Sequence, residues 1–325
     1  MLHLSLKGWL VGMTITVALV SIVLPLVVST HGGWLAMVLI TLCGVPHGAT
    51  DHLLFRHVHR DASAGWLYRF VARYFLLMGL LLVTWMILPS LAFMIFLAVS
   101  VYHFGQAQWH YIRMSSALRM VLYSLWGAFV LFSPLLWNYT ETQPIIASLT
   151  GLDIYLSADF QFIIPILLAF LVVISTILLF ILDKITIADL IWENFVVLVL
   201  TFLFSATPLL VGFATYFVCW HSFDSMQQQV QAFQVYRRDY TASTYFKEVI
   251  PFFLLALLSL LGFAYWTTAP LLSDAWVGQF FMLISVVTLP HSILMDAFLE
   301  GMKPSLETKQ DAPTSARVII VEQTG

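Results

Sequence analysis

Residues 161–182 have the sequence QFIIPILLAFLVVISTILLFIL, which contains no charged side chain. A helix needs roughly 20 mostly apolar residues to cross the hydrocarbon core of a bilayer. This segment is long enough to do so alone, and it predicts a transmembrane helix. The composition of the segments on either side decides whether that helix belongs to a larger membrane domain.

The apolar character extends over the whole chain. Hydrophobic residues make up 61% of the 325 residues and charged residues only 10%, and the mean hydropathy is +0.92. A soluble domain carries roughly 25% charged residues, so this composition cannot build a water-exposed surface. The sequence therefore predicts an all-α, polytopic transmembrane helix bundle surrounded by membrane lipid. No basic patch or nucleic-acid motif is present, and no nucleic-acid partner is expected.

Aromatic residues are abundant, with 26 Phe, 11 Trp and 12 Tyr. Some are expected to anchor the helices at the membrane interfaces. Two interpretations of the remainder stay open: ordinary lipid-facing side chains, or the walls of a cavity for a large apolar or conjugated ligand.

The hydropathy pattern predicts ten membrane spans. Proline and small polar residues separate the closest pairs, as at Pro89-Ser90 and Ala206-Thr207-Pro208. The expected spans are 8–28, 34–55, 70–88, 91–112, 119–138, 161–182, 187–204, 207–225, 248–268 and 277–299.

The basic residues give these spans a direction. Lys and Arg collect in cytoplasmic loops, and all 14 of them fall on one side of the ten-span arrangement. The loops of the other side, 30–33, 139–160 and 267–276, contain none. We therefore expect a multi-pass protein of the cell inner (cytoplasmic) membrane with both termini in the cytoplasm. Residues 1–301 are expected to form a single transmembrane catalytic domain, and 302–325 a polar, disordered cytoplasmic tail.

Four histidines lie inside the expected spans, where ionisable side chains are costly and mark functional sites. They are His47, His103, His221 and His291, in spans two, four, eight and ten. All four spans run in the same direction, which places the imidazoles roughly 6–15 Å from the cytoplasmic face. One such histidine could be a hydrogen-bonded helix contact, but four at matched depth favour a shared metal site. Imidazole suits iron, copper, zinc and nickel.

Three polar residues are expected around this site without binding the metal. Asp51 follows His47 by four residues, on the same helix face, and would orient its imidazole as a hydrogen-bond acceptor. The alternative for Asp51 is a carboxylate at the interfacial end of the helix. His52 lies about 140° around the helix from His47, so the two are not expected to share one metal. His110 lies two turns beyond His103, nearer the interface.

The segments around these histidines resemble motifs of the Brp/Blh family, bacteriorhodopsin-related membrane proteins of bacteria and archaea. The resemblance extends from about residue 34 to about residue 300. Its four motifs are Pro46-His47-Gly48-Ala49-Thr50-Asp51-His52, Tyr102-His103-Phe104-Gly105, Trp220-His221-Ser222 and Leu289-Pro290-His291. Members of that family act as β-carotene 15,15′-dioxygenases, which cut the central double bond to give two retinals. The resemblance therefore implies Fe(2+) as cofactor and β-carotene, or a related carotenoid, with O2 as substrates. A rhodopsin-type opsin that accepts the retinal would be a further partner.

The resemblance also implies an iron-ligand set. Carried over to this chain, the ligands assigned in the family are His47, His103 and His221. The family pattern has a second histidine four residues after the Trp-His-Ser histidine, where this chain has Ser225. We expect His291 to complete the metal site in its place.

The resemblance and the apolar spans together imply that a C40 carotenoid enters sideways from the lipid, along a tunnel walled by aromatic side chains. Two other classes stay open at this point. One is a transporter or a proton or metal relay protein that uses the intramembrane histidines, although no inverted repeat or charge-lined path supports it. The other is a different histidine-iron membrane oxygenase, although clustered His-x-x-His-His boxes are missing.

Overall fold

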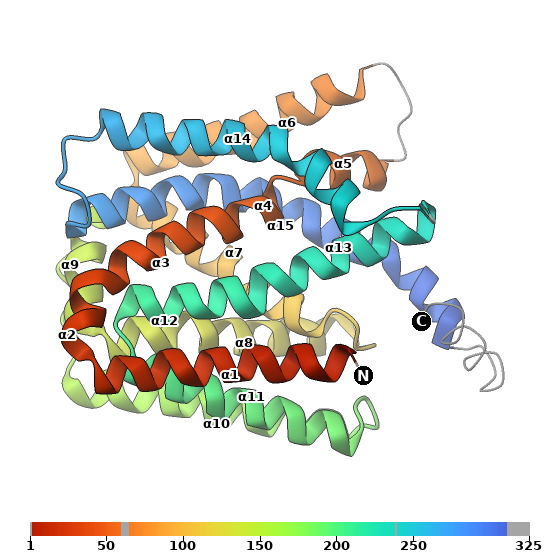
Figure 1. The fold of residues 1–325 in the computed structure, drawn as a ribbon, viewed down its shortest axis with the longest axis horizontal. Helices are drawn as coiled ribbons and strands as arrows, with labels where there is room; N and C mark the ends of the chain where they lie inside the picture. The colour runs from red at the N-terminus through yellow and green to blue at the C-terminus, as the bar shows by residue number, and fades with distance from the viewer. Residues whose placement is uncertain (1, 60–64, 238, 311–325) are drawn as a thin grey trace.

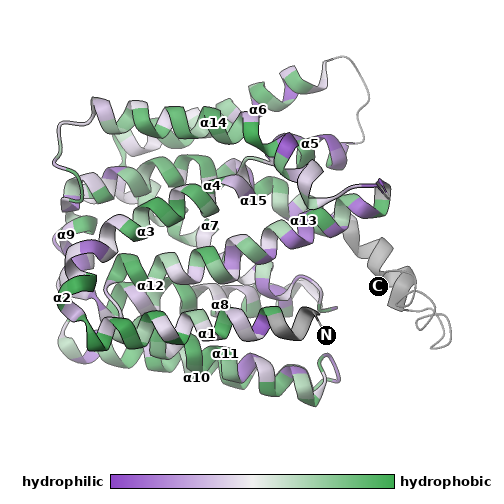
Figure 2. Cartoon of the chain, in the orientation of Figure 1, coloured by the Kyte–Doolittle hydropathy of each residue, from purple (hydrophilic) through white to green (hydrophobic). Residues whose placement is uncertain are grey.

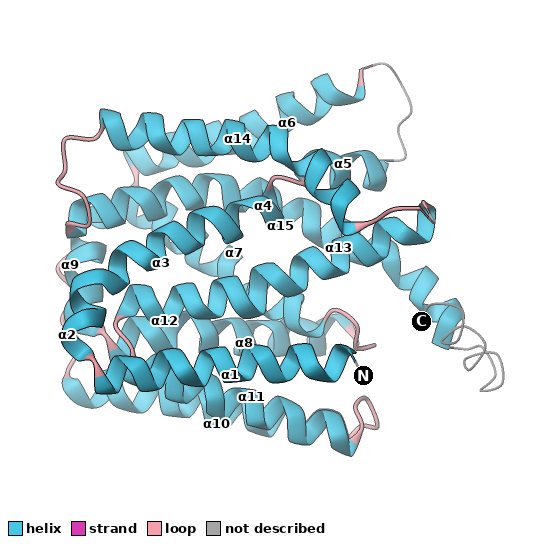
Figure 3. Ribbon diagram, viewed as in Figure 1, coloured by secondary structure: helices cyan, strands magenta, loops and turns pink. Residues whose placement is uncertain are grey.

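The computed structural model describes residues 2–59, 65–237 and 239–310, and every regular element in them is a helix (Figure 3). Three short stretches are π-helices, labelled η. In chain order the elements are α1 Leu2–Val23, α2 Pro25–Val27, η1 Val28–Gly32, α3 Gly33–Leu39, η2 Ile40–Gly44, α4 Val45–Gly48, α5 Asp51–His59, α6 Trp66–Ile87, α7 Pro89–Trp109, α8 Ser116–Trp137, α9 Tyr139–Thr150, α10 Ala158–Ile181, α11 Ile187–Ala206, α12 Leu209–Tyr216, η3 Phe217–Ser222, α13 Phe223–Tyr236, α14 Ala242–Trp266 and α15 Asp274–Gln310.

Among the described residues, 9 helical stretches are long and apolar enough to cross a membrane. They correspond to nine of the ten expected spans, with the second forming one stretch from Pro25 to His59. The eighth expected span, 207–225, does not meet this criterion. It corresponds to α12, η3 and α13, which follow one another without a break.

The course of the chain makes α12, η3 and α13 a tenth crossing. Figure 1 shows these elements running beside the other long helices from one end of the bundle to the other. The start of α1 and the end of α15 lie at the same end of the bundle. A chain that starts and finishes at one end must cross an even number of times, so this more polar helix adds to the nine apolar ones.

The two ends of the bundle differ in polarity. Hydrophilic residues gather toward the end that carries α5 and α13, whereas the middle of most helices is hydrophobic (Figure 2). At the opposite end lies α9, a helix within the expected loop 139–160 that the hydropathy pattern did not predict. At the terminal end, α13 continues the eighth crossing to Tyr236. The last helix, α15, reaches Gln310, past the expected domain boundary at 301, and residues 311–325 of the expected tail lie outside the described residues.

Two glycines bring α7 and α8 into backbone contact. A Cβ atom on Gly105 would lie 1.8 Å from the carbonyl oxygen of Tyr123, and one on Gly127 would lie 1.7 Å from that of Val101. Small residues at helix interfaces allow this close approach in membranes. The main apolar core lies between α7, α8, α10 and α11 and contains large side chains such as Trp109 and Trp126. The tight pair fixes the position of α7, which carries His103.

Candidate metal centre

The four expected histidines meet in the interior of the bundle. His47 lies on α4, His103 on α7, His221 in η3 and His291 on α15, with exposed fractions of 7%, 4%, 3% and 4%. The rings of His47 and His103 each make edge-to-face contacts with those of His221 and His291. The centroid of the His47 ring lies 5.3 Å from that of His221 and 5.0 Å from that of His291, and the corresponding distances from His103 are 5.0 and 5.2 Å.

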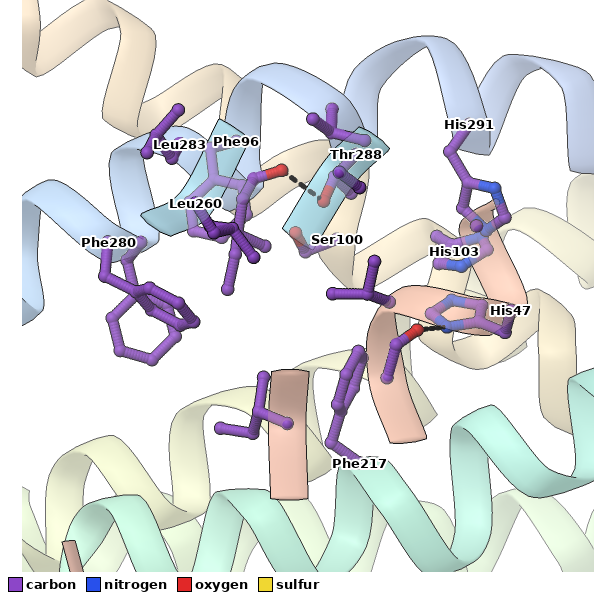
Figure 4. A pocket seen from close by; sticks show the side chains of 18 of the residues that line it. His47, Phe96, Ser100, His103, Phe217, Leu260, Phe280, Leu283, Thr288 and His291 are labelled. Carbon is purple, nitrogen blue, oxygen red and sulfur yellow. Dashed lines mark hydrogen bonds between the residues drawn. The ribbon is translucent and has the colours of Figure 1, made fainter. Parts of the chain in front are cut away.

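Three of the four histidines are spaced as metal ligands would be. One ring nitrogen each from His47, His103 and His291 lie within 4.8 Å of one another, and Figure 4 shows these three side chains converging. A metal about 2.1 Å from each nitrogen requires separations of at most about 4.2 Å. Side-chain adjustments below 1 Å would therefore close the site. The ring of His221 contacts the rings of His47 and His103, but its nitrogens are not part of this closely spaced set.

The free ring nitrogens fit a metal better than a packed core. Both nitrogens of His103 and of His221, and Nε2 of His291, are buried without a hydrogen-bond partner. A buried polar atom without a partner costs about 1–3 kcal/mol, so five of them in one cluster would be expensive as ordinary packing. A metal ion that accepts the one lone pair of each ring would satisfy three of them, and the second nitrogen of His103 and of His221 would carry the ring proton.

His47 is oriented by the backbone just before it. Its Nδ1 donates to the carbonyl of Gly44, the last residue of η2. The proton on Nδ1 leaves the lone pair on Nε2 available for a metal. This contact was not predicted, because no side-chain pattern marks a π-helix, although such segments are frequent at functional sites.

Asp51 orients His291 rather than His47, contrary to the sequence-based expectation. Nδ1 of His291 donates to Oδ1 of Asp51 at 2.7 Å, and the Tyr74 hydroxyl donates to Oδ2 at 2.7 Å. The expectation assumed a continuous helix, but α4 ends at Gly48 and α5 begins at Asp51. At this break the Thr50 hydroxyl donates to the carbonyl of His47 at 2.7 Å. Asp51 therefore points toward α15.

A buried glutamine supports the same break. The amide oxygen of Gln229, on α13, accepts hydrogen bonds from the hydroxyls of Thr50 and Tyr245, each at 2.9 Å. Its Nε2 donates to the carbonyl of His47 at 3.3 Å. Gln229 has an exposed fraction of 0%. It lies in the polar run 226–231 of α13, and so many glutamines next to an expected span are a sequence signal that could have indicated it. The network fixes the backbone of His47 against α13 and α14.

Two of the expected neighbours make their contacts elsewhere. His52 donates from Nδ1 to the carbonyl of Ala49 at 3.2 Å and stacks on Phe252 with centroids 3.8 Å apart. His110 donates to the carbonyl of Ala107 at 3.3 Å, and its ring adjoins that of Tyr111. These interactions do not join either residue to the four histidines.

Ser225 and His291 differ in their access to the site. His291 lines the cavity described next, while Ser225 is not among the described residues that do so. The Ser225 side chain is 1% exposed, and its hydroxyl has no hydrogen-bond partner. This placement favours His291 over position 225 as the group nearest the other histidines.

The four histidines form one end of a cavity of about 450 Å³. Ligand sites typically have volumes of about 300–1,000 Å³. The rest of the wall is almost wholly apolar and rich in aromatic rings, including Phe96, Phe217, Phe280 and Phe281. Figure 4 shows Phe280, Leu260 and Leu283 at the end away from the histidines. Part of the aromatic content therefore builds a ligand cavity rather than only a lipid-facing surface.

The comparison with protein families agrees with this geometry. The family model described as Beta-carotene 15,15′-dioxygenase matches residues 38–299, which include all four histidines, Asp51 and Tyr74. No curated protein and no solved structure gives a significant match. Since the match extends over most of the chain and contains the whole histidine cluster with its cavity, the chain belongs to the beta-carotene 15,15′-dioxygenase family.

Proposed function

We propose that this protein cleaves the central 15,15′ double bond of β-carotene, or a closely related carotenoid, with O2 to give two retinal molecules. The balance is simple: the carbon–carbon double bond and the O–O bond break, and each new aldehyde receives one oxygen atom. No external reductant is required. The observation that carries this proposal is the joining of four buried imidazoles to one apolar, aromatic cavity.

The donor set supports iron(II) as the cofactor. His47, His103 and His291 would hold the metal, with His221 as the adjacent fourth imidazole. Iron bound by imidazoles would supply the activation of O2. The chain's own groups fix the donor atoms, because the Gly44 carbonyl and the Asp51 carboxylate each hold a proton on Nδ1 and leave Nε2 free.

The cavity would position the substrate. A conjugated chain can lie against the rings of Phe96, Phe217 and Phe280, which exclude water from the reacting bond. Holding the double bond beside the histidines replaces a chance encounter with a fixed geometry. Retinal is itself apolar, so the product would pass into the membrane lipid or to an opsin.

The distribution of basic residues supports an inner-membrane location with both termini in the cytoplasm. A reporter fused after Arg237 tests this orientation. A reporter that works only in the cytoplasm should be active when fused after Arg237, and one that works only on the outer side should be inactive there. Activity of the second reporter would overturn the topology.

Retinal formation in carotenoid-producing cells tests the activity. Cells that express the protein should lose β-carotene and accumulate about two retinals for each β-carotene consumed, whereas His47→Ala should not. Rapidly quenched reactions under 18O2 should place one labelled oxygen in each retinal. Unchanged β-carotene with the wild-type protein, or a hydroxylated or desaturated product, would favour a transporter or another oxygenase.

A further inference from the structure

Part of the cavity wall is also part of the outer surface of the bundle. Four apolar cavity-lining side chains are strongly exposed: Val71 and Phe75 on α6 at 39% and 63%, Leu255 on α14 at 60%, and Val287 on α15 at 40%. The cavity is not fully enclosed, and side chains that both line it and are this exposed mark where it opens. The opening is therefore bounded by α6 and α14, with α15 behind it.

This opening lies at the depth of the lipid. Phe75 is nine residues from Trp66, the start of α6, or about 14 Å along the helix, and Leu255 is thirteen residues from Ala242, the start of α14, or about 20 Å. The hydrocarbon core is about 30 Å thick, so both rim residues lie within it. Their exposed side chains face acyl chains rather than water.

The surface beside the opening is apolar as well. On α14, Leu254, Leu258 and Leu261 have exposed fractions of 49%, 65% and 58%. A solute that reaches the opening must already be dissolved in the membrane. An apolar polyene fits this requirement, whereas a charged or strongly polar ligand does not.

The opening also lies close to the histidines. Val287 is one turn before His291 on α15. Phe75 directly follows Tyr74, whose hydroxyl bonds to Asp51, the acceptor for His291. A molecule that passes between α6 and α14 therefore enters the same cavity that the four histidines line.

We infer that the carotenoid enters from the bilayer through this opening between α6 and α14, with Phe75, Leu255 and Val287 as its rim. The inference rests on the proposed function and adds to it the route of the substrate. Ala256 also lines the cavity from α14 and is half-buried. A large side chain at this position would narrow the route without touching a histidine.

The decisive variant is Ala256→Trp, and the matched control is Leu258→Trp on the same helix. Leu258 is 65% exposed and is not among the cavity-lining residues. In lipid vesicles that contain β-carotene, Ala256→Trp should lower kcat/KM for retinal formation about tenfold or more, with its iron content unchanged. The control should stay within about twofold of the wild type. Iron content also verifies that each variant is folded.

A second measurement does not depend on turnover. In a background with Cys43→Ser and Cys219→Ser, Phe75→Cys should react with a lipid-soluble thiol reagent, and β-carotene should protect it under anaerobic conditions. Leu258→Cys should react without protection. If the wild type forms no retinal, the proposed function fails. If the wild type forms retinal, but Ala256→Trp keeps its kcat/KM and β-carotene does not protect Phe75→Cys, the route through this opening fails.

Discussion

The hydrogen bond between Asp51 and His291 leads to a specific prediction about metal affinity. Asp51→Asn keeps the size of the side chain but removes the negative charge that accepts the Nδ1 proton of His291 at 2.7 Å. It also changes the acceptor for the Tyr74 hydroxyl. The variant should fold, because the change is nearly isosteric, yet His291 should lose its fixed orientation.

The expected magnitude follows from the kind of bond removed. A hydrogen bond to a charged group contributes about 1.5–3 kcal/mol, and loss of a group that orients a metal-bound histidine typically lowers metal affinity by about 10–100-fold. The two estimates agree, since about 1.4 kcal/mol corresponds to a factor of ten. Tyr74→Phe leaves the Asp51–His291 bond in place and removes one neutral donor. It should lower affinity by only about 2–10-fold.

The assay is competition for iron(II) with a chelator of known affinity, measured for Asp51→Asn, His291→Ala and the double variant. If Asp51 acts through His291, the double variant should bind iron no more weakly than His291→Ala alone. If Asp51 instead orients His47, the two losses should add. Additive losses, or full iron affinity in Asp51→Asn, would refute the assignment of Asp51 to His291.

Three further outcomes are expected. His291→Ala should lose as much iron as His47→Ala, and adding Ser225→His should restore part of it, since residues four apart share a helix face; intact iron in His291→Ala would exclude it as a ligand. Gly105→Ala, whose Cβ would lie 1.8 Å from a backbone oxygen, should lower the thermal stability and the iron content, while Gly79→Ala, with nothing within 4 Å, should change neither. Thr142 lines the cavity, is 2% exposed, and has a hydroxyl without a hydrogen-bond partner. Thr142→Val should therefore raise the free energy of unfolding by about 1 kcal/mol, and a drop in melting temperature would contradict this.

Hydropathy and charge were sufficient to predict the helix bundle, because both follow from the cost of placing polar groups in lipid. They also predicted that the four histidines lie in one layer of the membrane, which favoured their meeting in the interior of the bundle. Nothing in hydropathy marks α9, which has 12 residues and is too short to cross. It runs within a loop and helps to close the end of the bundle opposite the termini.

Finer details of the site needed the structure. The prediction that Asp51 orients His47 was wrong, because the i to i+4 rule holds only within a continuous helix and the helix breaks between Gly48 and Asp51. Tyr74 and Gly44 were missed because a tyrosine on a lipid-facing helix and a glycine carbonyl have no distinguishing pattern. The opening beside Phe75 depends on which apolar residues of α6 and α14 face each other, and the long apolar runs of both helices have few polar residues that would distinguish one face from another.

The two π-helices at the site affect how relatives of this protein should be compared. His47 follows the end of η2 with two residues between, Val45 and Pro46, and His221 lies within η3. A π-helical turn accommodates one residue more than an α-helical turn through its wider hydrogen-bond spacing. Deleting a single residue there would convert the π-helical turn into an α-helical one, so the histidine would keep its direction. The same deletion in an α-helical turn would rotate the histidine by about 100° and direct it away from the cavity. In an alignment, a one-residue gap within 40–44 or 217–220 is thus compatible with an intact centre, whereas such a gap in the α-helix just before His103 or His291 would mark a protein that retains every histidine of the motifs and has still lost the centre.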